Sequence, residues 1–424
     1  MKTYINDATI LSLEQLVEFA RQHSPYYAKH YRKIPKHGWQ LCDLPLVNSA
    51  GYWAGNHDLA SWPVLTAPFT HGLAFKTGGT TGACKLSLYT HNEWYAFVTR
   101  FSRSLSNQLQ SGDRVGNLFF AGDLYSSFLF IHQALFHADI PLCEYPFSGT
   151  IDPQGLFTQI RQHKINILAG VPATLLQLAA KATQQHQPLL EISLLLFGGE
   201  SLFSEQSLLL QRAFPCARIA SIGCAGVDSG LIGQSDAQCQ IGEHRVFEPE
   251  TIVEIIDEVT GEQIEDEGRT GMLVITNLTR QLMPLIRYPT GDTAAWSEPK
   301  GQPARRFFLH GRSSFGHRIR VGHSTIYPDE IDALISKLLG EQQWQMRVEH
   351  HGYYDQLTLR IAFLGDDNHA KTLGHAIQKK YSHAVKQLES DQLHWVIEWC
   401  QQDELIRNIR TGKLQRIIDN RTYV

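Results

Sequence analysis

The sequence lacks the short motifs that mark several familiar catalytic chemistries. Its 424 residues contain no H-E-x-x-H segment and no cysteine pair at zinc spacing, which argues against a zinc site. They contain no G-x-S-x-G nucleophile elbow either, which argues against α/β-hydrolase chemistry. The function must therefore rest on other residue patterns.

Charge, cysteine and apolar runs are equally restrained. The formal net charge is -4 and no lysine- or arginine-rich block occurs, so nucleic acid is not an expected partner. The seven cysteines never form C-x-x-C, and their odd number argues against a disulfide framework. They predict a protein of the cytoplasm, where cysteines stay reduced. No run approaches the roughly 18 apolar residues of a membrane span, and Glu14 and Glu18 interrupt the N-terminal stretch, so neither membrane nor secretion is predicted.

The sequence does contain the alternation of an α/β protein. Short apolar runs recur at Val115–Phe120, Ile140–Cys143, Ile165–Val171, Leu194–Phe197 and Ile219–Ile222. Several of these runs are separated by stretches with a helical pattern. One helix is predicted to begin at Asp152-Pro153, with a capping carboxylate and a first-turn proline. Strands that alternate with helices predict βαβ units and a mostly parallel sheet. Ile252–Ile256 and Met272–Thr276 instead predict an antiparallel hairpin.

The length exceeds what one core usually serves, so we expect at least two domains. The predicted fold class is α/β. A large N-terminal region of several α/β subdomains with mostly parallel sheets occupies 1–311, and a small mobile α+β domain occupies 315–424, with a hinge near 312–314. A helix from Pro328 belongs to the small domain, and the polar pair His350-His351 is predicted to be solvated.

One stretch, Thr77 to Lys85, is rich in the residue types that surround phosphate groups. It holds three glycines, three threonines and a lysine within nine residues. Glycines let the backbone approach a ligand closely, and successive N–H groups with hydroxyls and a cation can hold a phosphate. The stretch is neither G-x-G-x-x-G nor the P-loop of nucleoside triphosphatases, because Ala83 and Cys84 separate Gly82 from the lysine. A surface turn is the competing interpretation.

Other segments suit a nucleotide, each with a plainer alternative. Gly198-Gly199-Glu200 follows the run Leu194–Phe197, where ligands of open α/β sheets bind, or it is an ordinary strand-to-helix turn. Tyr288 to Asp292 ends in a carboxylate that can accept two hydrogen bonds from ribose hydroxyls, or it is a Pro-Gly turn. Arg312 and Lys413 follow glycines and are either ligand contacts or ordinary surface cations.

Taken together and in this order, these segments resemble the adenylate-forming (acyl-activating) superfamily of ligases, over most of the chain. Details favour its phenylacetate–coenzyme A ligase branch. The segments that carry the resemblance are Ser24-Pro25-Tyr26-Tyr27, Thr77 to Lys85, Val171-Pro172-Ala173, Leu285 to Asp292, Gly311-Arg312, Val321 to Pro328 and Thr411 to Arg416.

The resemblance implies a two-step mechanism. ATP and a carboxylic acid give an acyl-adenylate and pyrophosphate, and a second nucleophile, often a thiol, then displaces AMP. The residues implied to contact ATP or AMP are Gly79, Thr80, Thr81, Gly82, Gly198, Gly199, Glu200, Asp292 and Arg312. Lys85 on the phosphates and Lys413, which would bridge the α-phosphate and the carboxylate, are the implied catalytic residues. Rotation about Ser313-Ser314 would carry Lys413 away for the second step.

The resemblance fails at one segment. The family has an aromatic-Gly-x-Thr/Ser-Glu pattern that stacks on adenine and helps to hold Mg²⁺, whereas this chain has Ile222 to Gly226. Asp228, two residues on, is the candidate replacement for the metal-binding Glu. Loss of a stacking face weakens nucleotide binding, since stacking on a base is worth about 1–3 kcal/mol. Cys84 is a further departure, at a position where proline is common.

The acyl pocket is predicted from the stretch after the first strand of the alternation. Phe119 to Ser127 contains a glycine and aromatic residues, and it includes Tyr125 and Ser126. Ile222 and Gly223 are predicted to form the floor. Aromatic walls favour a planar acid. An ordinary buried aromatic cluster is the alternative.

The predicted protein is therefore a cytoplasmic enzyme that activates an aromatic carboxylic acid with ATP and Mg²⁺ and passes it to a thiol such as coenzyme A. One alternative is a specialised secondary-metabolism enzyme, acting for example on a phenazine-type acid in antibiotic biosynthesis. It would pass the acyl-adenylate to an amine, a carrier protein or a reductase. A second alternative is a degenerate homologue that binds nucleotide or acid without turnover. The acid, the acceptor and the oligomeric state, including a homodimer, stay open.

Overall fold

The protein is described from a computed structural model. The structure describes residues 10–76, 85–122, 124–147, 152–199, 202, 204–312, 319–321, 324–326, 328–340, 342–352, 354–385, 393–401, 404–406 and 416–421. Within these ranges, no helix is long and apolar enough to cross a membrane.

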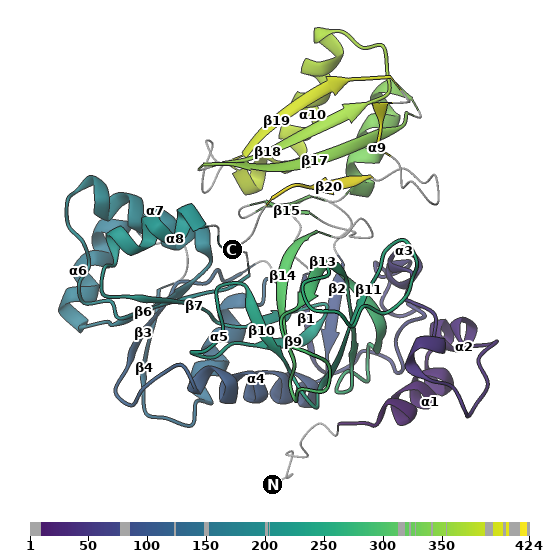
Figure 1. Ribbon diagram of the computed structural model, residues 1–424, viewed down its shortest axis with the longest axis horizontal. Coiled ribbons are helices and arrows are strands. Elements are labelled where there is room, and N and C mark those ends of the chain that lie inside the picture. Colours follow the sequence, from purple (N-terminus) through teal and green to yellow (C-terminus); the bar gives the residue numbers. More distant parts are fainter. Residues whose placement is uncertain are drawn as a thin grey trace.

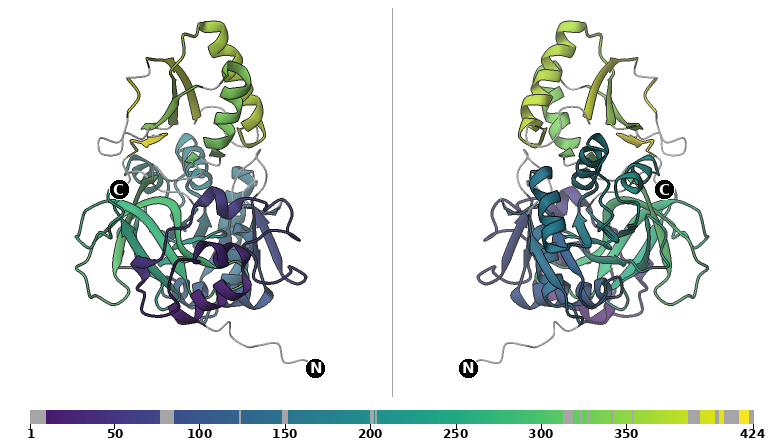
Figure 2. Two further views of the ribbon diagram at one scale, coloured as in Figure 1. Left: turned by 90° about the vertical axis from the view of Figure 1, so that its right-hand side faces the viewer. Right: turned by 90° about the vertical axis from the view of Figure 1, so that its left-hand side faces the viewer.

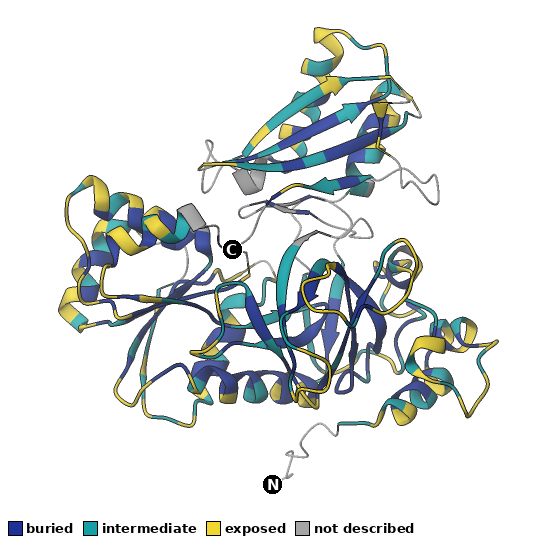
Figure 3. Ribbon diagram, viewed as in Figure 1, coloured by how far each residue is buried: buried dark blue, intermediate teal, exposed yellow. Residues whose placement is uncertain are grey.

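The helices lie mainly on the outside of the molecule. They are α1 (Leu13–His23), α2 (Pro25–His30), α3 (Ser49–Trp53), α4 (His91–Ser106), α5 (Ser127–Phe136), α6 (Pro153–His163), α7 (Pro172–Gln184), α8 (Ser204–Ala213), α9 (Pro328–Leu339) and α10 (Asp367–Val385), with a short 3-10 helix at Leu41–Asp43. Exposed positions gather on the outer helices and loops, whereas the strands beneath them are largely buried (Figure 3).

A parallel sheet forms one half of the N-terminal region (Figure 1). Its strands are β3 (Arg114–Asn117), β4 (Cys143–Pro146), β5 (Ile167–Gly170), β6 (Leu194–Phe197) and β7 (Arg218–Ser221). They lie in the order β4-β3-β5-β6-β7, and each neighbouring pair is parallel. The parallel sheet predicted from the alternation of apolar runs and helices is confirmed.

Helices cover both faces of this sheet, which explains why its inner strands β5 and β6 are apolar and buried at every position. Successive side chains of a strand point to opposite faces. Ile167 and Ala169 accordingly join the core beneath α4 and α5, whereas Leu168 joins the core beneath α6, α7 and α8. Asp152 caps α6 as predicted, since its side chain accepts a hydrogen bond from the Gly155 N–H.

One predicted strand was misplaced. The run Ile140–Cys143 was expected to form the second strand of the sheet, but β4 begins at Cys143, opposite Arg114. Ile140 lies in the loop before β4, where it is only partly buried and packs against the core. As an edge strand, β4 pairs on one side alone and tolerates Pro146 at its end, so apolar runs mark its bounds poorly.

A second, wholly antiparallel sheet holds the other half of the N-terminal region. Its strands, in sheet order, are β11 (Thr251–Ile256), β12 (Gly271–Asn277), β13 (Leu285–Trp296), β14 (Arg306–Arg312), β10 (Glu243–Val246), β9 (Gly230–Gln234) and β8 (Cys224–Gly226). The predicted antiparallel pairing is confirmed, with Ile256 opposite Met272. A small antiparallel pair, β1 (Leu73–Lys76) and β2 (Leu86–Tyr89), flanks the undescribed stretch 77–84.

The N-terminal helices pack against this antiparallel sheet. Ser12 caps α1 in a reciprocal capping box with Gln15, as predicted. Tyr27 is fully buried, and its hydroxyl donates to the Pro284 carbonyl at 2.9 Å. Tyr27, the second tyrosine of the Ser24-Pro25-Tyr26-Tyr27 segment, is therefore a packing residue that connects α2 to the start of β13.

A separate small α+β unit follows, drawn above the N-terminal region in Figures 1 and 2. Its sheet has the order β19-β18-β17-β20, made of β17 (Trp344–His351), β18 (Tyr354–Ile361), β19 (Leu393–Trp399) and β20 (Ile417–Asp419). The short pair β15 (Ile319–Val321) and β16 (Ser324–Ile326) precedes α9. The predicted α/β fold with a small C-terminal α+β domain is confirmed, whereas the hinge at 312–314 stays a prediction.

The prediction for His350 was wrong. His350 lies on β17, its side chain is only 8% exposed, and its Nδ1 lies 2.7 Å from Asp355 Oδ1. Arg421 Nη1 approaches the same carboxylate at 3.3 Å. Solvation was inferred from the polar residues around His350, but β17 alternates, with Trp344, Met346 and Val348 on the buried face. His351 is exposed, as expected.

Candidate active site

Two of the predicted site segments meet at the carboxyl edge of the parallel sheet. Gly198 directly follows β6, and Ile222 directly follows β7. A Cβ on Gly198 would lie 2.5 Å from Ile222 Cγ2, so only glycine fits against that side chain. The Ile222 N–H also donates to the Phe197 carbonyl at 2.7 Å. The predicted adenine border and the predicted floor of the acyl pocket are therefore one continuous surface.

Two glycines of this surface adopt backbone conformations that favour glycine. Gly199 has φ +81° and Gly223 has φ +126°. A Cβ on Gly223 would lie 3.0 Å from a ring carbon of Phe101 and 3.2 Å from the Gly233 carbonyl oxygen. Gly199 is exposed, so its backbone is open to a ligand at this edge.

The predicted acyl-pocket stretch lies beside the same surface. Phe119 Cζ would be 3.7 Å from a Cβ on Gly198, which places the end of β3 against the glycine turn. Tyr125 is half-buried, and its ring packs edge-on against Phe120 at 5.9 Å. Ser126 is half-buried at the start of α5, where its carbonyl accepts from the Phe130 N–H. Phe119 is itself part of the buried core, whereas Phe120 and Tyr125 are partly exposed aromatic side chains against which a planar group can pack.

The second predicted pair is brought together by the antiparallel sheet. Asp292 on β13 and Arg312 on β14 are opposite each other in the strand register. Asp292 is half-buried, and its N–H donates to the Thr290 hydroxyl at 3.2 Å, which fixes the turn at Gly291. Gly291 has φ +86°, so this bend of β13 favours a glycine. Backbone register thus juxtaposes the two residues predicted to hold the ribose.

Lys85 is the described end of the predicted phosphate loop. It is half-buried, and its Nζ lies 5.9 Å from the centre of the Trp53 ring. The Trp53 indole N–H donates to the Tyr288 hydroxyl at 3.1 Å, and Tyr288 precedes Asp292 on β13. The predicted phosphate-binding lysine and the predicted ribose-binding strand are therefore linked through one tryptophan. The sequence reasoning missed Trp53, because a single tryptophan before the loop belongs to no motif.

Asp228, the predicted metal ligand, is 1% exposed. The pKa of Tyr89 is raised, mainly by burial. The positive charge of Arg280 lowers this pKa, and the negative charge of Asp228, which lies nearby, raises it. Arg280 stacks on that ring, with its Cζ 3.6 Å from the ring centre. No group of three or more His, Cys, Asp or Glu that could hold a metal occurs among the described residues. One carboxylate fits Mg²⁺ that is bound largely by substrate phosphates and water.

Several predicted residues lie outside the part of the chain that the structure describes. They are Gly79, Thr80, Thr81, Gly82, Cys84, Glu200 and Lys413, together with the side chain of Arg312 and the hinge serines Ser313 and Ser314. Their roles stay predictions.

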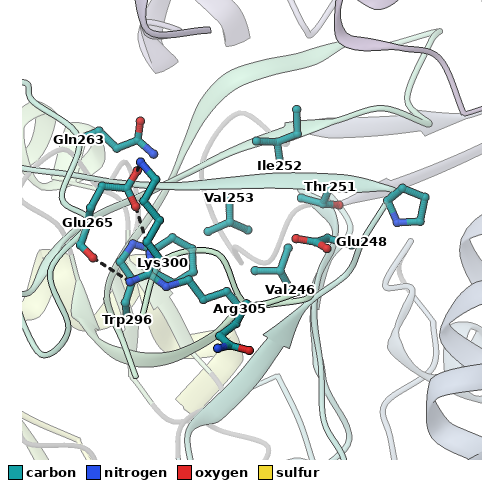
Figure 4. Close-up of a pocket in the computed structure, with 12 residues that line it drawn as sticks. Val246, Glu248, Thr251, Ile252, Val253, Gln263, Glu265, Trp296, Lys300 and Arg305 are labelled. Carbon is teal, nitrogen blue, oxygen red and sulfur yellow. Dashed lines mark hydrogen bonds and ion pairs between the residues drawn. The ribbon is translucent and has the colours of Figure 1, made fainter. Parts of the chain in front are cut away.

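A cavity of about 410 Å³ lies elsewhere, in the antiparallel sheet (Figure 4). Trp296 and Arg305 form one wall, with the guanidinium carbon 4.2 Å from the indole centre. Glu265 pairs with both Arg305, at 3.1 Å, and Lys300, at 3.1 Å. No residue predicted to bind nucleotide or acid lines this cavity. The cavity therefore shares no lining residue with the site described above.

Two family profiles match the chain. The profile described as AMP-binding enzyme matches residues 74–283, and the profile described as AMP-binding enzyme C-terminal domain matches residues 324–421. Together they cover most of the chain. The first match contains Asp228 and the surface formed by Gly198, Gly199, Ile222 and Gly223, which we call the glycine surface. The second match contains most of the small C-terminal unit. The chain belongs to the AMP-binding enzyme superfamily and is an enzyme of the adenylate-forming class.

Individual relatives narrow the comparison to the branch named from the sequence. The chain is 24% identical over 356 residues to the phenylacetate–coenzyme A ligase of Aromatoleum evansii. This alignment covers 81% of this chain and 78% of the relative. It is 29% identical over 232 residues to the indoleacetate–lysine synthetase of Pseudomonas savastanoi, over 52% of this chain and 53% of the relative.

A solved structure shares the fold. A 2-hydroxyisobutyryl-CoA ligase, crystallised with its acyl-AMP and coenzyme A in the thioesterification state, superposes with a TM-score of 0.69 at 18% identity. The match covers 99% of this chain and 91% of that one. This likeness shows the shared fold.

Proposed function

We propose that this enzyme activates a carboxylic acid with ATP. In the first step an acid oxygen attacks the α-phosphorus of ATP, the bond to the β-phosphate oxygen breaks, and pyrophosphate leaves with that electron pair. In the second step a thiol, such as that of coenzyme A, attacks the acyl carbon, loses its proton to solvent, and AMP leaves. The observation that carries the proposal is the strand register of β13 and β14, because it sets an aspartate, Asp292, and an arginine, Arg312, at facing backbone positions.

The remaining roles are part of the same proposal. Asp292 would hold the ribose hydroxyls, with the guanidinium of Arg312 beside it. Gly198 and Gly199 would border the adenine, and Lys85 would offset the charge of the polyphosphate. Asp228, which is buried, would share Mg²⁺ with the phosphates. Lys413, carried by the small C-terminal domain, would stabilise the charge that develops at the α-phosphate.

The acid is proposed to be aromatic. Phe119 lies beside Gly198, and the next residue, Phe120, packs against Tyr125. Planar rings pack well between aromatic walls. The names of two relatives, which mention phenylacetate and indoleacetate, support an aromatic acid.

A second candidate differs only in the acceptor. The likeness to a synthetase whose name joins indoleacetate with lysine favours transfer of the acyl group to an amine. The altered segment from Ile222 to Gly226 is consistent with a specialised member of the superfamily, for which a polycyclic acid such as a phenazine carboxylate is one substrate to test.

The test is acid-dependent release of pyrophosphate from ATP, measured over phenylacetate, indoleacetate, a phenazine carboxylate and a fatty acid. Release with an aryl acid alone supports the proposed substrate class, and release with the fatty acid alone contradicts it. Addition of coenzyme A or lysine then identifies the acceptor by the mass of the product. ATP binding without release for any acid would favour the homologue without turnover.

A further inference from the structure

A short segment that precedes the AMP-binding profile braces two parts of the candidate site. It runs from Trp53, at the end of α3, to Asn56, and the profile match begins only at residue 74. The segment touches Lys85-Leu86 on one side and Tyr288 on the other. These are the exit of the predicted phosphate loop and the strand that carries Asp292.

Trp53 makes contacts in both directions. Its side chain is buried, and its indole N–H donates to the Tyr288 hydroxyl at 3.1 Å. Its ring lies 5.9 Å from Lys85 Nζ, within the range of a cation–π attraction. Trp62 stacks on the ring at 5.6 Å with an interplanar angle of 18°, so the indole packs against a second buried aromatic ring.

Asn56 holds the backbone next to Lys85. It is 3% exposed, its Nδ2 donates to the Leu86 carbonyl at 3.0 Å, and its Oδ1 accepts from the Leu86 N–H at 2.6 Å. The side-chain amide therefore acts as a strand partner for the first residue of β2. These two hydrogen bonds restrain the backbone of Leu86, and with it that of the adjacent Lys85, close to the Trp53–Asn56 segment.

We propose that Trp53 and Asn56 are positioning residues for the polyphosphate end of ATP. This inference rests on the proposed function and adds residues outside the profile match to it. A lysine has a flexible four-carbon stem, and holding it over an aromatic face lowers the rotamer entropy that is lost when it binds a phosphate. The bond from Trp53 to Tyr288 keeps the lysine in register with the ribose site.

The chain offers a matched control for the test. Trp62 belongs to the same aromatic stack and is 3% exposed, and its indole N–H donates to the Tyr52 carbonyl at 2.9 Å. Trp62→Phe and Trp53→Phe each remove one buried indole hydrogen bond and keep an aromatic ring. Only Trp53→Phe removes a bond to β13, so a purely structural role predicts equal effects for both variants.

The experiment measures the dissociation constant for ATP by calorimetry, the KM values for ATP and acid, and the melting temperature. We expect both variants to lower the melting temperature, and Trp53→Phe alone to weaken ATP binding about fivefold, the usual loss for one hydrogen bond. Tyr288→Phe should weaken it by a similar factor, and the double variant should be no weaker than either single one. Asn56→Asp, which places a carboxylate against the Leu86 carbonyl, should also weaken ATP binding.

The failures are distinguishable. Unchanged ATP affinity in Trp53→Phe and Asn56→Asp, with turnover intact in the parent, overturns the positioning role and leaves the proposed function in place. A parent protein that binds ATP without releasing pyrophosphate overturns the proposed function, and the dissociation constants of the variants still decide the positioning role. A parent that does not bind ATP overturns both.

Discussion

Asp292 and Arg312 are direct partners in the register of β13 and β14, although a long loop and a full strand separate them in the sequence. The glycine turn at Gly291 precedes Asp292 on the bent strand β13. A carboxylate and a guanidinium that start from facing backbone positions can contact one ligand from two directions. The antiparallel sheet therefore sets the geometry of the proposed ribose site, and its register is the first feature to test.

Substitution of Asp292 tests that site. Asp292→Asn keeps the size of the side chain but removes the charge and one acceptor, so we expect the KM for ATP to rise about tenfold, since a charge-assisted hydrogen bond contributes about 1.5–3 kcal/mol. The KM for the acid should change little. Asp257→Asn, in the loop between β11 and β12, serves as the control, because its carboxylate accepts from the Val259 and Thr260 N–H groups away from the site. An unchanged KM for ATP would contradict the ribose role.

Lys413 is predicted to act only in adenylate formation. Lys413→Ala should slow acid-dependent pyrophosphate release about 100-fold, the size of loss typical for one preorganised electrostatic group. Conversion of a supplied acyl-adenylate to the thioester should continue at the parent rate. Lys337→Ala, an exposed lysine of the same domain on α9, is the control. A Lys413→Ala protein that adenylates as fast as the parent would remove this lysine from the mechanism.

The ion pair between Glu254 and Arg287 should govern stability. The side chains are 2% and 6% exposed, and Arg287 Nη1 also donates to the Leu44 carbonyl at 2.6 Å. Arg287→Met leaves a buried carboxylate unpaired, so we expect it to lower the free energy of unfolding by about 3–5 kcal/mol in urea. Arg269→Met breaks an exposed pair with Asp257 and should cost less than about 1 kcal/mol. Equal losses in the two variants would contradict this ranking.

Acid sensitivity should come in part from His244. Burial lowers the pKa of His244 from 6.5 to about 4, and its Nδ1 has no hydrogen-bond partner among the described residues. The unfolded chain binds this proton below pH 6.5 and the folded chain does not, so stability is complete above pH 6.5 and falls as the pH falls toward 4. The loss between pH 7 and pH 4 is about 3 kcal/mol.

The measurement is urea unfolding as a function of pH. His244→Leu removes the titrating group, so its stability should fall less steeply than that of the parent over this interval. The same substitution at exposed His351 serves as the control and leaves the parental slope in place, because His244 is still present. Parallel pH profiles for His244→Leu and the parent would show that His244 does not contribute.

Short-range sequence patterns predicted several strands and helix caps of the fold correctly. The bounds of β6 match the predicted run Leu194–Phe197, because a strand covered on both faces is apolar at every position. Caps at Ser12 and Asp152 are short-range hydrogen bonds, so their residue spacing is visible in the sequence. The bounds of edge strand β4 were missed, because one-sided pairing places a weaker demand on its residues.

Contacts between distant segments were beyond sequence reasoning. The pairing of His350 with Asp355 depends on a tight turn between β17 and β18, whereas the polar residues there predicted that His350 is solvated. Trp53 and Asn56 gain their importance only from partners at Leu86 and Tyr288. The motif residues Gly198 and Ile222 were named separately, and only the folded chain reveals that they touch.

That contact between Gly198 and Ile222 has a consequence for altering substrate preference. Because a methyl group at 198 would overlap the isoleucine side chain, the two positions share a fixed volume. Gly198→Ala is tolerable only beside a smaller neighbour such as Ile222→Ala, and Ile222→Ala alone leaves a cavity next to Gly198. Libraries that vary only one of the two positions will contain mostly variants that clash or leave a cavity. Paired substitutions can exchange side-chain volume between the two positions without leaving a cavity.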